Sequence, residues 1–395
     1  MRSIGIFTYS TKPRGSVVHA ACLAEALQRK GAQVTLYALS KAGHGFFRPL
    51  SCELQLILAE PAPSQVDALI RQRIAEFCVG IRALGASHSI CHAEDCLAAN
   101  ALIAARAELH EARLVRTVHH LEHFESPYLM DCQRRSVAGA DLVLSVSQVT
   151  SREVQSAFGR EAPVISNGVD LRRFAARSAL DEQHLAERLG IRADDLVVLS
   201  VGGVEPRKNS LVALQAVALA FAFAPRLRWV IAGGASIWEH DAYRQEFTRQ
   251  LAALPAELRE RITILGTVPE GELSALYQLS DVLLCPSLQE GFGLCVLEAL
   301  AAKCAVIVPQ GAPFDEYLDE RCATFVNPRS ASQIASALTR LFNDEPERER
   351  SASAGHERVQ RFSWDLVAER HLARYESVLG SDALGPRQAL SEINK

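Results

Sequence analysis

The sequence lacks several features that would point to particular classes of protein. Lysine and arginine total 42 against 46 for aspartate and glutamate, so there is no excess of positive charge to bind a nucleic acid. No apolar run approaches the roughly 18 residues that a bilayer-spanning helix needs. Repeats at solenoid spacing and low-complexity tracts are also missing. We therefore expect neither a nucleic-acid partner nor a transmembrane segment nor a repeat architecture.

The N-terminus has no signal-peptide pattern, and the cysteines have no clear metal-binding pattern. Met1 to Ile4 leads directly into a predicted strand, so we expect a cytoplasmic protein. The ten cysteines stand singly in apolar surroundings, which is typical of buried free thiols. Cys91, His92, Glu94 and Cys96 are close enough in sequence to form a zinc site, but no second set with matching spacing follows. We therefore expect no metal site and no cofactor, with this zinc site as the less favoured alternative.

The chain does have the length and the apolar pattern for two domains. Its 395 residues exceed the ~250–300 at which one hydrophobic core usually stops growing. Strand-like apolar runs alternate with helix-like stretches, first from residue 4 to residue 146 and again from residue 196 onwards. This alternation predicts an α/β fold with doubly wound parallel sheets.

The stretch from Pro286 to Leu300 combines the end of a strand, a glycine loop and the start of a helix. Val282 to Cys285 predicts a short buried strand, and helix formers follow the glycines. Because Gly291 and Gly293 flank Phe292, the backbone there can adopt positive φ and can approach a ligand closely. Free N–H groups in the first turn of the following helix would favour an anion such as a phosphate.

Two carboxylates frame this predicted anion site. Glu290 comes just before the glycines and Glu298 lies within the helix. A carboxylate repels a diphosphate unless it points elsewhere, so a ribose and a sugar are better partners for these side chains. A phosphate site flanked by two hydroxyl-binding carboxylates predicts a nucleotide sugar as the ligand.

Glu290 and Glu298, spaced as Glu-x7-Glu within Pro-Ser-x-x-Glu-Gly-Phe-Gly-Leu, resemble the signature of a large family of retaining glycosyltransferases, family 4 (group 1), with the GT-B fold. The resemblance implies two Rossmann-like domains that face a central cleft, with a crossing near Asn167 to Asp170. The implied parts are an acceptor-side domain at 1–170, a nucleotide-sugar donor domain at 171–362, a helix at 363–380 that crosses back to the first domain, and a polar tail at 381–395.

The resemblance also implies roles for residues of the donor domain. Glu290 would lie at the transferred sugar, and Glu298 would bind the ribose hydroxyls. The backbone of Val268 would face the nucleobase, and Lys208 would neutralise the diphosphate. Gly203 stands where the family has an arginine, and the role of the neighbouring Arg207 stays open. The segment whose backbone would meet the sugar and the diphosphate consists of Gly291, Phe292, Gly293 and Leu294.

The resemblance assigns three positions of the N-terminal half, of which Gly15 and His119 match the family pattern and Ser16 departs from it. Gly15 and Ser16 open the first predicted helix, so their N–H groups would face the crevice where ligands of such sheets bind. The family usually has two glycines here, and Ser16 replaces the second. The resemblance places the active-site histidine at His119, near the donor sugar. A metal site formed by His119, His120 and His123 is the alternative interpretation.

The function that the resemblance implies is the transfer of a hexose, with retention, from a nucleoside diphosphate sugar to a hydroxyl of a sugar, lipid or small metabolite. Glu290, His119 and Lys208 would be the catalytic residues. The chain has no Asp-x-Asp triplet, which holds the metal–diphosphate clamp in the other major glycosyltransferase fold, so we expect no metal dependence. Two alternatives remain, a nucleotide-sugar epimerase or hydrolase of the same fold and a non-catalytic nucleotide-sugar-binding module.

Overall fold

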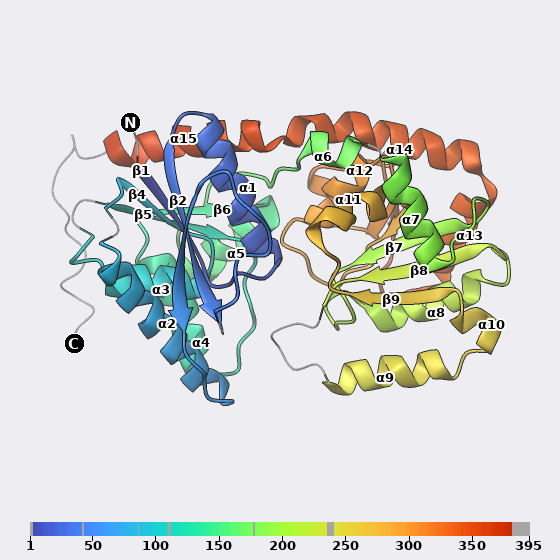
Figure 1. Cartoon of the computed structure of the whole chain (residues 1–395), viewed down its shortest axis with the longest axis horizontal. Coiled ribbons are helices and arrows are strands. Elements are labelled where there is room, and N and C mark those ends of the chain that lie inside the picture. Colours follow the sequence, from blue (N-terminus) through green and yellow to red (C-terminus); the bar gives the residue numbers. More distant parts are fainter. Residues whose placement is uncertain are drawn as a thin grey trace. The chain divides into compact units, whose positions relative to one another are not determined.

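The computed structural model describes residues 3–41, 43–85, 87–109, 112–176, 178–234 and 241–380, and the predicted tail at 381–395 lies outside them. The chain divides into two compact units. Unit 1 contains the described residues of Met1–Val146, Thr150–Ile165 and Asp365–Lys395, and unit 2 those of Ser147–Val149 and Ser166–Trp364. Each unit is built around one six-stranded parallel sheet (Figure 1). The predicted α/β fold class is therefore confirmed.

The sheet of unit 1 has the strand order β3-β2-β1-β4-β5-β6, which is the order of a Rossmann sheet. Its strands are β1 (Ser3–Thr8), β2 (Gln33–Lys41), β3 (Glu53–Ala59), β4 (Ile90–Ala93), β5 (Arg113–Val118) and β6 (Leu142–Ser145). Its helices are α1 (Gly15–Arg29), α2 (Val66–Ala83), α3 (Cys96–Ala104), α4 (Pro127–Ala138) and most of α5 (Gln148–Phe158) and α15 (Trp364–Gly380). The strand order reverses between β1 and β4, which is where sheets of this kind bind ligands.

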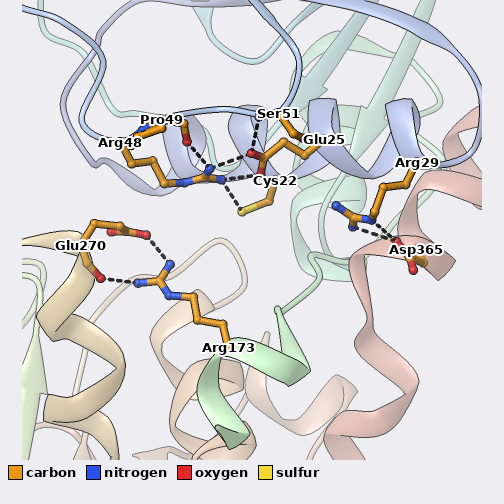
Figure 2. Close-up of polar contacts among 9 residues, drawn as sticks. All are labelled: Cys22, Glu25, Arg29, Arg48, Pro49, Ser51, Arg173, Glu270 and Asp365. Carbon is orange, nitrogen blue, oxygen red and sulfur yellow. Dashed lines mark hydrogen bonds and ion pairs between the residues drawn. The ribbon is translucent and has the colours of Figure 1, made fainter. Parts of the chain in front are cut away.

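The central strands β4 and β5 are buried along their whole length, which shows that helices cover both faces of this sheet. α2, α3 and α4 pack against one another on one face. α15 lies on the same face as α1, and Tyr375 Oη is 2.7 Å from His92 Nδ1 of β4. An exposed ion pair also joins these two helices, with Arg29 Nη2 2.8 Å from Asp365 Oδ1 (Figure 2). Exposed pairs of this kind contribute little, so the buried contacts hold α15 in place.

Unit 2 repeats this topology in the order β12-β11-β10-β7-β8-β9, with its first strand beside its fourth. Its strands are β7 (Leu196–Val201), β8 (Leu227–Ala232), β9 (Ile262–Gly266), β10 (Val282–Leu284), β11 (Ala305–Pro309) and β12 (Thr324–Val326). Its α-helices are α6 (Leu171–Ala175), α7 (Ala179–Leu189), α8 (Ser210–Ala220), α9 (Asp241–Ala252), α10 (Ala256–Arg259), α11 (Glu270–Leu279), α12 (Leu294–Ala301), α13 (Ala331–Asn343) and α14 (Glu345–Val359). Two short 3-10 helices follow β11 and α14, at Phe314–Glu316 and Gln360–Phe362.

The short helix α6 is fastened to α11. The guanidinium of Arg173 donates to the carboxylate and to the backbone oxygen of Glu270, the first residue of α11 (Figure 2). Gln278 Nε2 donates to Phe174 O at 3.1 Å. The Phe174 ring also packs edge-on against Tyr277, with 5.5 Å between the ring centroids. These contacts fix the face of α11 that carries Tyr277. Among the described helices, none combines the length and the apolar character needed to cross a membrane.

Candidate active site

Two loops of unit 2 meet where its strand order reverses. β7 and β10 are parallel neighbours, so the loops that follow them emerge side by side. Leu288 N donates to Arg207 O at 2.8 Å, and Asn209 Nδ2 donates to Pro286 O at 3.1 Å. These two hydrogen bonds join the loop at 202–209, which carries Lys208, to the glycine motif. The sheet topology therefore unites two sequence motifs that are 82 residues apart at Lys208 and Glu290.

Lys208 and Glu290 form an almost buried ion pair. Lys208 Nζ donates to Glu290 Oε1 at 2.7 Å, and the two side chains are 14% and 9% exposed. Arg207 Nη1 lies 3.1 Å from the same oxygen, and Ser287 Oγ donates to it at 2.9 Å. Burial would raise the pKa of Glu290, but Lys208 and Arg207 outweigh it and lower the pKa to about 2. Two cations and one carboxylate leave a net positive charge beside the glycine turn.

Glycine is required at Gly202 and Gly203 because the chain is crowded there. Gly202 has φ 123°, and a Cβ there would collide with Lys208 Cε, so the lysine side chain reaches Glu290 across this glycine. Gly203 has φ 78°, and a Cβ there would lie 2.8 Å from Gly234 O. An arginine at Gly203 would therefore displace the backbone. The second cation beside Lys208 comes from Arg207, whose role the sequence had left open.

The glycine turn leads directly into α12. Gly293 precedes the helix with φ 96°, and a Cβ there would lie 2.8 Å from Phe314 Cε1. No side chain of the described residues caps this helix. Val296 N donates to Gly293 O at 3.0 Å, so the N–H groups of Leu294 and Cys295 are the ones that remain for an anion. The Phe292 ring instead stacks on Tyr317 with 4.6 Å between centroids, and it is 4% exposed. Phe292 thus anchors the turn, while the backbone around it is the part that can meet a ligand.

Glu298 projects from α12 toward α11. Tyr277 Oη, fully buried, donates to Glu298 Oε2 at 2.6 Å and so holds one carboxylate oxygen in place. Burial raises the pKa of Glu298, although Tyr277 and Arg173 oppose this effect. Sequence analysis missed Tyr277, because a tyrosine within an apolar helix face looks like an ordinary core residue. Val268 lies half-buried in the loop between β9 and α11.

In unit 1, the loop after β1 ends in the exposed start of α1. Gly15 and Ser16 are the first two residues of this 15-residue helix, as expected. No atom lies within 4 Å of a Cβ built on Gly15, and no side chain of the described residues caps the helix. The first-turn N–H groups are thus open to a ligand at the point where the strand order reverses.

His119 directly follows β5 and contacts Glu94, which directly follows β4. His119 Nε2 lies 3.0 Å from Glu94 Oε2, and their side chains are 14% and 0% exposed. His19 Nε2 is 3.7 Å from the same oxygen, and His92 Nε2 is 3.5 Å from Glu94 Oε1. Burial lowers the pKa of His119 and His92 well below the usual range and raises that of Glu94. Sequence analysis had weighed Glu94 only as a metal ligand, although its place after a strand neighbouring β5 could have indicated this contact.

The sequence suggested two alternative metal sites, one around Cys91 and Cys96 and one at His119, His120 and His123. Cys91 is buried within β4, and Cys96 begins α3. His120 Nε2 lies 2.8 Å from Glu122 Oε1 at a partly exposed position. Within the described ranges, no three His, Cys, Asp or Glu side chains are arranged to hold a metal ion.

Family models match two consecutive parts of the chain. The model described as Glycosyltransferase Family 4 matches residues 13–173, and the model described as Glycosyl transferases group 1 matches residues 181–358. The first match lies mainly in unit 1, and the second lies within unit 2.

Curated relatives include glycosyltransferases with inositol-based names. The D-inositol 3-phosphate glycosyltransferase of Corynebacterium glutamicum is 26% identical over 287 residues, which cover 68% of this chain and 68% of the relative. The phosphatidyl-myo-inositol mannosyltransferase of Mycobacterium tuberculosis is 30% identical over 247 residues, which cover 61% of this chain and 60% of the relative. The chain spans about half to two thirds of the length of the curated relatives it matches.

Solved structures share the fold over nearly the whole chain. The sucrose-phosphate synthase of Thermosynechococcus elongatus has a TM-score of 0.80 at 21% identity, covering 96% of this chain and 100% of that one. HepE of Anabaena, in complex with UDP-glucose, has a TM-score of 0.77 at 20% identity, covering 95% of this chain and 100% of that one. The two family models and this shared architecture show that the chain belongs to the group 1 glycosyltransferases of family 4 and has the GT-B fold.

Proposed function

We propose that this glycosyltransferase moves a hexose from a nucleoside diphosphate sugar to an acceptor hydroxyl, with retention of the anomeric configuration and without a metal ion. The observation that carries this proposal is the Lys208–Glu290 ion pair beside the uncapped start of α12. It places fixed positive charge, open N–H donors and a carboxylate at one turn of the chain. A diphosphate linked to a sugar needs all three.

The diphosphate would bind to the first-turn N–H groups of α12 and to Lys208. The lysine ammonium has three donors, so it can keep its bond to Glu290 and still donate to a phosphate oxygen. Arg207, 38% exposed, supplies a second cation at the same point. Negative charge grows on the diphosphate as the glycosidic bond breaks, so these fixed donors stabilise the transition state more than the bound substrate.

Glu290 is suited to hydrogen bonding with the sugar rather than to covalent catalysis. One of its oxygens is bound by Lys208, Arg207 and Ser287. A carboxylate whose pKa is about 2 is a weak nucleophile. We therefore assign it to a sugar hydroxyl and leave bond formation to the acceptor, which attacks on the face from which the diphosphate departs. Glu298, held by Tyr277, would bind the ribose hydroxyls.

The relatives suggest the first substrates to try. HepE was crystallised with UDP-glucose, so UDP-hexoses lead the donor panel. Inositol phosphates and phosphatidylinositol lead the acceptor panel, because the curated relatives are named for inositol-based acceptors.

The test begins with a thermal-shift screen of nucleotide sugars, because a ligand that binds the folded state raises Tm. The donor identified in this way is then incubated with each acceptor, and nucleotide release and the anomeric configuration of the product are measured. Nucleotide release without any acceptor would indicate a hydrolase or epimerase, and binding without release a non-catalytic module. If EDTA abolishes transfer and Mg²⁺ or Mn²⁺ restores it, the metal-independent part of the proposal is wrong.

A further inference from the structure

The contact between Glu94 and His119 is built into the sheet of unit 1. β4 and β5 are adjacent parallel strands, and each of the two residues directly follows its strand. Glu94 N also donates to Phe7 O at 3.0 Å, which fixes the backbone that carries the carboxylate. The Glu94 side chain is completely buried, whereas 14% of the His119 side chain remains exposed. Glu94 therefore meets His119 from inside the unit, where it can orient the ring without contacting a ligand itself.

The surroundings of Glu94 make His119 its strongest hydrogen-bonding partner. The other titratable or charged groups that face it are His19 from α1, His92 from β4, Arg116 from β5, Tyr375 from α15 and the neighbouring Asp95. Both ring nitrogens of His92 already have closer partners, with Tyr375 Oη and Thr117 Oγ1 each at 2.7 Å. Among the side chains that the structure describes, only that of His119, at 3.0 Å, is within ordinary hydrogen-bond length of the carboxylate.

Glu94 is only partly compensated at this position. Its Oε1 atom is buried and makes no hydrogen bond to any described residue. Burying a carboxylate without full hydrogen bonding costs free energy, but removing it alone would leave its buried partners His119 and Arg116 uncompensated. Among the described residues, the contact with His119 is therefore the main interaction through which this carboxylate acts.

A carboxylate beside one ring nitrogen decides what the other nitrogen can do. Burial keeps His119 neutral by lowering its pKa, so one ring nitrogen carries the proton and the other a lone pair. If Nε2 donates to Glu94 Oε2, then Nδ1 must be an acceptor. A lone pair on Nδ1 can accept a hydrogen bond from a hydroxyl group of the substrate, whereas a protonated Nδ1 cannot.

We propose that Glu94 is a positioning residue for His119, holding the ring in the tautomer protonated at Nε2 so that Nδ1 accepts a hydrogen bond from a substrate hydroxyl. This inference rests on the proposed function for the identity of that substrate, but its tautomer part does not. Glu94 itself touches neither substrate nor reacting atoms. It acts only through His119.

The first experiment compares Glu94→Leu and Glu94→Gln with wild type in the full chain. Glu94→Leu removes the acceptor and lowers kcat about ten- to a hundredfold, which is the effect of losing one charge-assisted hydrogen bond. Its Tm falls, because the buried groups around Glu94 lose a charged partner. Glu94→Gln retains an oxygen that can accept from Nε2, so it keeps kcat within about threefold of wild type. Unchanged kcat in Glu94→Leu would overturn the proposal.

The matched control is Asp95→Asn, which changes the neighbouring buried carboxylate. Asp95 has a structural role, since its two oxygens accept from Ala98 N and Tyr9 N, each at 2.8 Å. This variant lowers Tm and leaves kcat within about twofold, because it disturbs a cap and a loop. Both variants therefore lower Tm, but only Glu94→Leu is expected to lower kcat by more than about twofold. A kcat of Glu94→Gln as low as that of Glu94→Leu would contradict the positioning role.

Coupling between the two residues is measured in a His119→Ala background. There, Glu94→Leu produces no further loss in kcat, because the group that it positions is absent. Additive losses in the double variant would show that Glu94 acts by another route and would overturn the inference.

The tautomer of His119 is measured by a method that needs no enzyme activity. Nitrogen-15 NMR of labelled histidines, with the His119 signals identified by their loss in His119→Ala, shows Nε2 protonated and Nδ1 bearing a lone pair in wild type. In Glu94→Leu the signals move toward a mixture of tautomers. A wild-type ring protonated at Nδ1 would overturn the proposal. If wild type transfers no sugar but shows the expected tautomer, the proposed function fails while the positioning of His119 stands.

Discussion

Replacing Lys208 with methionine removes a charge from the centre of the candidate donor site while keeping the length of the side chain. In the structure Lys208 Nζ donates to Glu290 Oε1 at 2.7 Å. Burial alone would lower the pKa of this lysine, but Glu290 outweighs burial and raises it, so the ammonium is charged at every pH of interest. The substitution therefore removes a full positive charge from beside the glycine turn.

Two effects of different size follow. Loss of one charge-assisted donor to the departing diphosphate costs about 1.5–3 kcal/mol in the transition state, or about ten- to a hundredfold in kcat. Stability falls less than a broken buried ion pair would suggest, because Arg207 and Ser287 still contact Glu290 Oε1 at 3.1 Å and 2.9 Å. We expect a loss of about 1–2 kcal/mol in the free energy of unfolding.

Steady-state kinetics and urea unfolding check the two values on the same samples. The control is Arg226→Met, which breaks an exposed ion pair with Asp194 in the same unit and should leave kcat and KM unchanged. A rise in donor KM with unchanged kcat would mean that Lys208 binds the ground state and the transition state equally, which refutes the assignment to the leaving group. Unchanged kinetics with lowered stability would leave Lys208 only as the structural partner of Glu290.

Two further predictions concern the carboxylates. Glu298→Gln and Tyr277→Phe should both raise the donor KM about tenfold with little change in kcat, since a ribose contact is made equally in ground and transition states. Glu290→Gln should instead lower kcat. If Glu298→Gln lowers kcat and Glu290→Gln does not, the roles of the two carboxylates are exchanged. The pKa of Glu290 is lowered from 4.5 to about 2, so its contribution to stability is complete above pH ~4.5 and disappears as the pH falls toward 2. Between pH 5 and pH 2, wild type should therefore lose about 3 kcal/mol more unfolding free energy than Glu290→Gln in urea titrations, and parallel pH curves would contradict this.

The fold class and the main site motif were predictable from the sequence because each depends on a pattern within a short contiguous stretch. Short apolar runs alternating with helix-forming stretches indicate parallel strands with crossover helices wherever they occur. The glycine turn with Glu290 and Glu298 is likewise contiguous, and Gly293 has the positive φ that its position predicted. Lys208 was named through the family resemblance, which is also carried by a contiguous stretch of sequence.

Elements without an apolar pattern were missed. α14 (Glu345–Val359) was not predicted, because its sequence is largely Glu, Arg and Ser and only Ala352, Gly355 and Val359 are buried. The three-residue strand β12 (Thr324–Val326) is too short to show a period. Both elements owe their conformation to packing against the rest of unit 2 rather than to their own sequence pattern.

By itself, the sequence determined which residue types stand after each strand, and so the candidates for the site. Only the tertiary structure decided which of them meet. Parallel neighbours in a sheet are separated along the chain by whole crossover helices, so the contacts of Lys208 with Glu290 and of Glu94 with His119 depend on strand order, which no local pattern contains. The contact of Arg207 with Glu290 likewise depends on how the two loops meet.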